Sequence, residues 1–89
     1  MKIVNLRKTR DILFKVVAAG FAPKNIHVKK KRRKFAKEAA LEIARKNMVE
    51  NMKPKVSSFD IISLLKNEVV LKESYDEQDN CHIVLGVAA

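Results

Sequence analysis

The amino-acid sequence predicts an α+β fold, and three observations carry this prediction. Apolar residues make up 47% of the 89 residues, with two Gly and two Pro, which is typical of a folded globular chain. Apolar residues at three-and-four spacing indicate helices, and two alternating apolar runs near the end indicate strands. Because a chain of this length holds one hydrophobic core, we expect residues 1–89 to form a single basic α+β domain.

The first predicted element of substance is a helix that follows a short strand at residues 1–6. Thr9 offers a helix cap, and the apolar run after it ends at Gly20, a residue that favours the position just beyond a helix. Pro23 prevents continuation. Because apolar residues cover nearly every side of this run, we expect a buried central helix.

A second main helix is predicted from about Arg32 to Asn51, and Pro54 ends it. The preceding residues 25–29 alternate between apolar and polar, as in a short strand or an extended link. The apolar face of the second helix consists mostly of alanine, which lets another helix or a sheet approach closely.

The last third of the chain predicts a short third helix and a C-terminal β-hairpin. Ser57 and Asp60 form a capping pair in front of an apolar segment. The runs VVLKESY and CHIVLGV, residues 69–75 and 81–87, then read as two strands joined by residues 76–80. Val69, Leu71 and Tyr75 are expected on one face of the first strand. A helix followed by a hairpin also suggests a winged-helix-like arrangement.

The charge of the chain is unevenly distributed. The total is +9, but residues 24–55 carry 12 basic and 3 acidic residues, whereas residues 56–89 carry 2 and 6. Such a basic surface favours a polyanionic partner, of which nucleic acid is the commonest. The positive charge is concentrated where the second helix is expected to start, although a helix amino end favours acidic residues. The sequence therefore predicts that an anion binds there.

The predicted nucleic-acid-binding residues are the basic run and the cations that extend it along the helix. They are Lys29, Lys30, Lys31, Arg32, Arg33, Lys34, Lys37, Arg45 and Lys46. The chain has no Trp and one Tyr, and its four Phe lie in apolar patterns that favour a core role. We therefore expect contacts to phosphates more than direct reading of bases.

The residues that carry metal and redox chemistry are few. The lone Cys81 excludes an internal disulfide and a multi-cysteine zinc site, and it fits a reducing cytoplasm, with the nucleoid or nucleus included. His27 and His82 are the only imidazoles, and no catalytic triad, phosphate-binding glycine loop or metal-ligand spacing is present in the sequence. We expect no cofactor, no bound metal and no membrane span, and binding is favoured over catalysis.

The segment VSSFDIISLLKNEVVLKESYDEQDNCHIVLG, residues 56–86, resembles the middle of small RelE-superfamily toxins of the BrnT type. The shared features are a Ser-capped helix, an apolar strand, an acidic turn and an apolar strand that ends in Leu-Gly. Such toxins are basic ribonucleases, so the resemblance implies a ribonuclease activity. Tyr75 and His82 are then the residues to test first for catalysis.

Three functions follow from these observations. The leading hypothesis is a non-enzymatic protein that binds DNA or RNA through phosphates at the start of the second helix. Under this hypothesis, the protein could also form a homodimer through the alanine face or the hairpin edge. The alternatives are the ribonuclease toxin and a small inhibitor or adaptor of phage or viral type that binds a host or regulatory protein.

Overall fold

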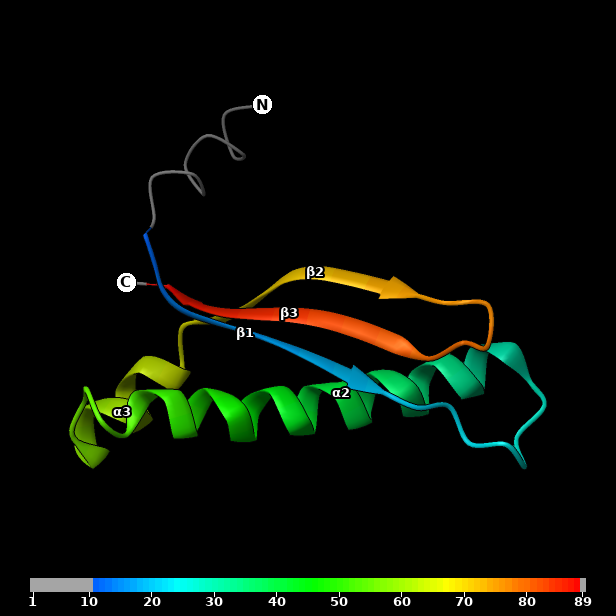
Figure 1. Ribbon diagram of the computed structural model, residues 1–89, viewed down its shortest axis with the longest axis horizontal. Coiled ribbons are helices and arrows are strands. Elements are labelled where there is room, and N and C mark those ends of the chain that lie inside the picture. The colour runs from blue at the N-terminus through cyan, green and yellow to red at the C-terminus, as the bar shows by residue number, and fades with distance from the viewer. Residues whose placement is uncertain (1–10, 89) are drawn as a thin grey trace.

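The computed structural model describes residues 11–88 as two layers, a three-stranded antiparallel sheet and a long helix that crosses one of its faces (Figure 1). This confirms the α+β class. The elements in chain order are β1 (Ile12–Gly20), α2 (Lys29–Met52), α3 (Ser58–Leu65), β2 (Glu68–Tyr75) and β3 (Cys81–Ala88). The predicted strand at residues 1–6 and the predicted cap at Thr9 lie outside the described residues.

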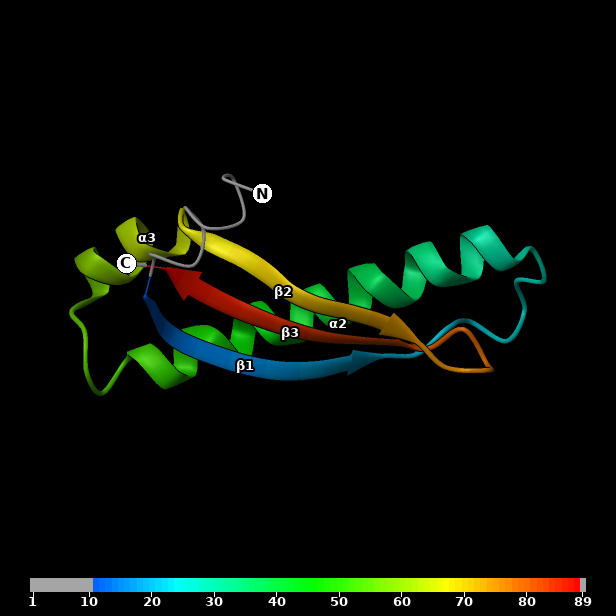
Figure 2. The same cartoon turned by 90° about the horizontal axis from the view of Figure 1, so that it is seen from above.

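The sheet has the order β1-β3-β2, so the last strand of the chain lies in the middle (Figure 2). The β3 residues that face α2 alternate along the strand and are completely buried; they are Cys81, Ile83, Leu85 and Val87. The helix buries Ala36, Ala40, Ala44, Met48 and Met52 at a spacing of four residues. The core therefore lies between α2 and the central strand.

The prediction of a helix across residues 12–20 is wrong, because these residues form β1. Burial alternates with a period of two along its second half, where Val16, Ala18 and Gly20 face α2 and Val17 is exposed. No described glycine has a positive φ, so Gly20 does not end a helix. A Cβ at Gly20 would overlap the carbonyl oxygen of Ala36, so glycine allows the close approach of β1 to α2.

The second predicted helix is confirmed, and α2 starts at Lys29, three residues before the predicted start. The residue before it, Val28, is extended, as an extended link requires. The alanine face packs on the sheet of the same chain, and Ala36, Ala40 and Ala44 have no exposed surface. It is therefore not available to a second copy of the chain, and only the hairpin edge remains as a predicted dimer contact.

The third helix and the hairpin are also confirmed. The Ser57 hydroxyl accepts a hydrogen bond from the Asp60 amide at 3.3 Å, which caps α3. A register shift between Val70 and Lys72 separates the two ends of β2. Tyr75 consequently shares the α2 side with Cys81, whereas Leu71 lies over Gly86 on the other face, so the prediction that Leu71 and Tyr75 share a face is wrong.

The winged-helix arrangement is not confirmed. The hairpin of β2 and β3 is joined by β1 on the far edge of β3, and α2 packs across the sheet. Within the described residues there is one long helix and one short helix, in place of the two main helices and a third that the sequence predicts.

Candidate nucleic-acid interface

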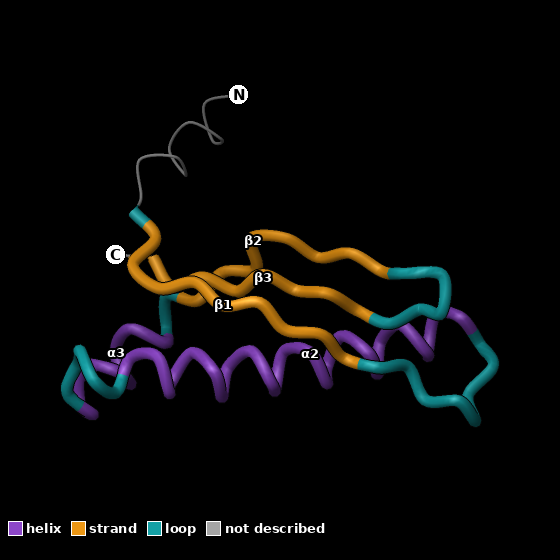
Figure 3. Tube along the Cα trace, in the orientation of Figure 1, coloured by secondary structure: helices purple, strands orange, loops and turns teal. Residues whose placement is uncertain are grey.

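The start of α2 lies at the same end of the molecule as two loops, residues 21–28 before the helix and the turn at residues 76–80 between β2 and β3 (Figure 3). The basic run and the acidic turn are far apart in the sequence and adjacent in the structure. Whether a cation of the basic run is free to bind a ligand therefore depends on whether this turn contacts it.

Asp79 of the turn is the partner of the two arginines in the basic run. Its carboxylate accepts hydrogen bonds from Arg33 Nε at 3.0 Å and from Arg32 Nε at 3.3 Å. These bonds hold the pKa of Asp79 below its usual value, with the bond from Arg33 as the largest cause. We call Arg32, Arg33 and Asp79 the Arg–Asp cluster.

Arg32 also joins three backbone segments. Its guanidinium donates to the carbonyl oxygens of Pro23 at 2.6 Å and Ile26 at 2.9 Å in the loop, and to that of Gln78 at 2.9 Å in the turn. Its side chain is 19% exposed. Because these bonds use most of the donors of the guanidinium, Arg32 holds the loop and the turn against α2.

The turn itself is organised by Asp76 and Asn80. One oxygen of Asp76 accepts from the amides of Gln78 at 2.9 Å and Asn80 at 3.0 Å. The side-chain oxygen of Asn80 then accepts from the Ala22 amide at 2.9 Å, which ties the turn to the loop before α2. Asp79 has a φ of 65°, a conformation that Asp adopts more readily than most residues.

Two further predicted binding residues are paired with β2. Lys37 Nζ lies 3.1 Å from one carboxylate oxygen of Glu73, and the other oxygen accepts a hydrogen bond from the Tyr75 hydroxyl at 2.6 Å. These contacts lower the pKa of Glu73, the Tyr75 bond most and the Lys37 bond next. Arg45 donates to both carboxylate oxygens of Glu68, from Nε at 3.0 and 3.2 Å and from a terminal nitrogen at 2.6 Å. Within residues 11–88, four of the nine predicted residues thus have an intramolecular carboxylate partner.

The other five predicted residues have no ion-pair partner within 4.0 Å in the described part of the chain. They are Lys29, Lys30, Lys31, Lys34 and Lys46, and all five are exposed. The first four lie in the first six residues of α2, and we call them the lysine cluster. The N-cap residue Val28 provides no side-chain acceptor, and the first turn contains no acidic residue. The positive end of the helix dipole and the four lysines therefore lie at the same end of α2, and no acidic residue of the first turn offsets them.

Sequence reasoning missed the role of Asp79. It treated the basic run as uniform and did not connect it with the acidic residues of the turn. No local pattern distinguishes Arg32 and Arg33 from the lysines around them, because the distinction depends on a contact across 46 or 47 residues. The one available signal is chemical: arginine binds a carboxylate and several carbonyls at once more readily than lysine does.

The two residues proposed for a ribonuclease site, Tyr75 and His82, do not lie together. Tyr75 pairs with Cys81 on the side of the sheet that faces α2, and His82 pairs with Ser74 on the opposite side. His82 Nε2 lies 3.5 Å from an Asp76 oxygen. Tyr75 contacts Glu73 and the Arg33 guanidinium, which lies 4.7 Å from its ring centroid.

Cys81 is buried, and desolvation raises the pKa of its thiol, as expected for a core residue. His27 is exposed in the loop before α2. Among residues 11–88, no group of three or more His, Cys, Asp or Glu side chains is arranged to hold a metal ion. No helix in this part of the chain is long and apolar enough to span a membrane.

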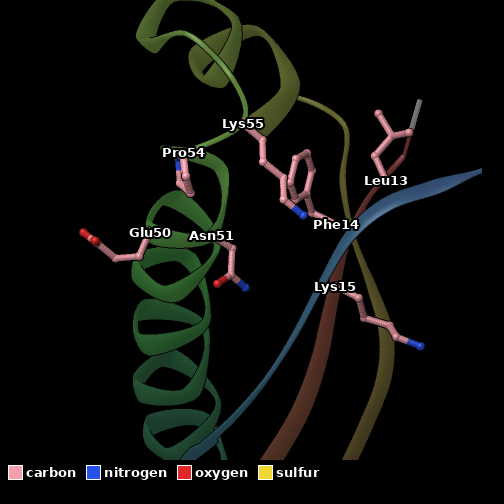
Figure 4. Close-up of a pocket in the computed structure, with 7 residues that line it drawn as sticks. All are labelled: Leu13, Phe14, Lys15, Glu50, Asn51, Pro54 and Lys55. Carbon is pink, nitrogen blue, oxygen red and sulfur yellow. The ribbon is translucent and has the colours of Figure 1, made fainter.

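An open cleft of about 430 Å³ lies between the start of β1 and the end of α2, at the other end of the molecule from the lysine cluster. Its lining residues are Leu13, Phe14, Lys15, Glu50, Asn51, Pro54 and Lys55 (Figure 4). Glu50 and Lys15 point away from one another in this view. These two charged side chains therefore do not converge on a common point, as they would around a small-molecule ligand.

Comparisons of the chain with protein-family models, with curated proteins and with solved structures gave no match.

Proposed function

We propose that this domain binds nucleic acid by contacting phosphates through the lysine cluster. The observation that supports the proposal best is the division of the basic run into two parts. Arg32 and Arg33 bind the carboxylate of Asp79 inside the molecule, whereas the four lysines around them are exposed and unpaired within the described residues.

This division matters because the paired arginines hold in place the backbone that carries the lysines. Arg32 anchors the first turn and a half of α2 to the loop and the turn, so the helix start is held in place before any ligand arrives. Mutual repulsion of the lysines opposes folding, and a bound polyanion would remove that repulsion. Phosphate is also favoured by the free amide groups at a helix amino end.

The charge of the neighbouring surface indicates where a polyanion would lie. On α2 beyond the lysine cluster, Glu38 and Glu42 are exposed, so negative charge follows within two turns. The loop before α2 adds Lys24 and no acidic residue. We infer that a nucleic-acid strand would cross the start of α2 and the loop and would not follow the helix along its length.

The test is a titration of the full chain with fluorescently labelled single-stranded DNA, duplex DNA and RNA at several salt concentrations. Four lysines that each neutralise one phosphate predict a slope of about −3 for the logarithm of the association constant against that of salt concentration. Affinity should then fall by roughly fifty-fold between about 50 and 200 mM salt. Absence of binding to all three ligands at the lowest salt would contradict the proposal and favour a protein partner.

The ribonuclease alternative has no comparable support. Its two suggested catalytic residues, Tyr75 and His82, lie on opposite faces of the sheet. Incubation of the purified chain with labelled RNA, followed by gel analysis, tests it directly, and intact RNA is the result expected from phosphate binding alone.

A further inference from the structure

Two phenylalanines are exposed beside the lysine cluster, although their sequence patterns predict core positions. Phe21, the first residue after β1, is 74% exposed, and Phe35 on α2 is 45% exposed. Large apolar side chains lose favourable burial when they face water, so an exposed aromatic ring next to a basic cluster suggests a surface that contacts a ligand.

The contact between β1 and α2 places the backbones of these two residues at the same end of the molecule as the lysine cluster. Gly20 lies against the backbone of Ala36, closely enough that no side chain fits between them. Phe21 follows Gly20 and Phe35 precedes Ala36, so both phenylalanines are adjacent in sequence to the two residues in contact. Lys31 lies one helical turn before Phe35, and Lys34 is its neighbour.

This inference rests on the proposed function. We propose that the ligand is single-stranded nucleic acid, whose unpaired bases stack on Phe21 and Phe35 while the lysine cluster binds the phosphates. Base stacking on aromatic side chains needs no particular base, because every base has a flat face. In a duplex these faces are covered by neighbouring base pairs, so a duplex would use the lysines alone.

An anionic membrane surface also attracts lysines and phenylalanines, but the charge of α2 favours a strand. A helix that lies flat on such a surface would bring the exposed Glu38 and Glu42 toward the same anionic layer as the lysines. A strand that crosses the first turns of α2 comes near Glu38 alone, one turn after Phe35, and does not reach Glu42.

The experiment compares a thymidine oligomer of roughly 12 nucleotides with an abasic oligomer of the same length, which keeps the phosphates and lacks the bases. The variants of the full chain are Phe21→Leu, which removes the ring, and Phe21→Tyr, which keeps it. Phe59→Leu is the matched control, since Phe59 is 83% exposed on α3, at the opposite end of the molecule (Figure 1). Phe35→Leu is added with a circular-dichroism check of folding, because Phe35 is partly packed.

We expect the wild-type chain to bind the thymidine oligomer about tenfold more tightly than the abasic oligomer. Phe21→Leu should remove most of that difference, whereas Phe21→Tyr and Phe59→Leu should keep it. Equal wild-type affinity for the two oligomers would overturn stacking and leave phosphate binding intact, and no binding to either would overturn both proposals. The same variants are also tested with vesicles of phosphatidylserine and phosphatidylcholine. If Phe21→Leu weakens binding to the vesicles and leaves binding to the thymidine oligomer unchanged, stacking is overturned in favour of a lipid surface.

Discussion

Lys31 and Arg32 are neighbours with the same formal charge, but the structure gives them different roles. Arg32 reaches three backbone carbonyls and Asp79 with a largely buried side chain, whereas Lys31 is exposed and has no partner within the described residues. A planar guanidinium donates in several directions at once, which a lysine ammonium at the end of a flexible chain does less well. Residue type, more than charge, separates the structural cations from those available to a ligand.

This difference predicts effects of unequal size on the free energy of unfolding. Arg32→Ala leaves the carbonyl oxygens of Pro23 and Gln78 without their donor, so we expect the free energy of unfolding to fall by about 2–3 kcal/mol. Lys31→Ala should change it by less than about 0.5 kcal/mol. Urea unfolding followed by circular dichroism measures both, and equal effects would contradict the structural role of Arg32.

Gly20 and Gly86 provide a second pair at the residue scale. A Cβ at Gly20 would meet the fixed backbone of α2, whereas one at Gly86 would meet the ends of the Leu71 and Ile12 side chains, which can move. We expect Gly20→Ala to destabilise the domain by about 3 kcal/mol and Gly86→Ala by about 1 kcal/mol or less. Chemical denaturation of the two variants compares them, and a larger effect at Gly86 would be inconsistent with the close approach of β1 to α2.

At the scale of elements, β1 shows why part of the fold could not be predicted from the sequence. Periodicity alone does not distinguish a strand from a buried helix when nearly every residue is apolar, as in ILFKVVAAG. The deciding interaction is distant: β3 would have an unpaired edge without β1, and a two-stranded hairpin is only marginally stable. The capped helix α3 and the alternating strand β3 were predictable because their signals are local.

The cap of α3 gives a prediction at this scale. Ser57→Ala removes the acceptor of the Asp60 amide, and such a loss typically costs about 1 kcal/mol. Ser58→Ala, at the neighbouring exposed position inside the helix, is the matched control and should have a smaller effect. Amide hydrogen exchange of α3 is the measurement, and unchanged protection in Ser57→Ala would show that the cap does not hold the helix.

The attachment of α2 to the hairpin predicts a dependence on pH. The pKa values of Asp79 and Glu73 are lowered in the folded state by their contacts with Arg33 and with Tyr75 and Lys37. A lowered folded pKa means that the stabilisation is present above the unfolded value of about 4 and is lost as pH falls through the folded value. The thermal midpoint of unfolding should therefore decrease as the pH is lowered below about 5.

Asp79→Asn separates the charge of this residue from its backbone conformation, since Asn also tolerates a positive φ. The variant should have a lower thermal midpoint than the wild-type chain at pH 7. It should also lose less on acidification, because one of the carboxylates with a lowered pKa is gone. A variant that loses as much as the wild-type chain between pH 6 and pH 3 would rule out the Arg–Asp cluster as a source of the acid sensitivity.

At the scale of the whole molecule, the lysine cluster and the cleft lie at opposite ends of the domain. The helix α3 lies at the same end as the cleft (Figure 1). The sequence predicts the positive end correctly as a location, because the cations are contiguous. It does not predict that the acidic turn folds back onto that location and pairs with two of the cations, since this depends on the order of strands in the sheet.

The central claim, that the unpaired lysines at the start of α2 bind nucleic acid, is tested most directly by two double variants of equal charge. Lys31→Glu with Lys34→Glu reverses two members of the lysine cluster, and Lys55→Glu with Lys66→Glu reverses two exposed lysines at the other end. We expect the first to weaken binding of a labelled single-stranded oligonucleotide at low salt by at least about a hundredfold, because it adds repulsion to the loss of two phosphate contacts. The second should weaken it by less than about tenfold. Equal losses in both variants, with both folded, would show that only the total charge matters and would contradict a located site.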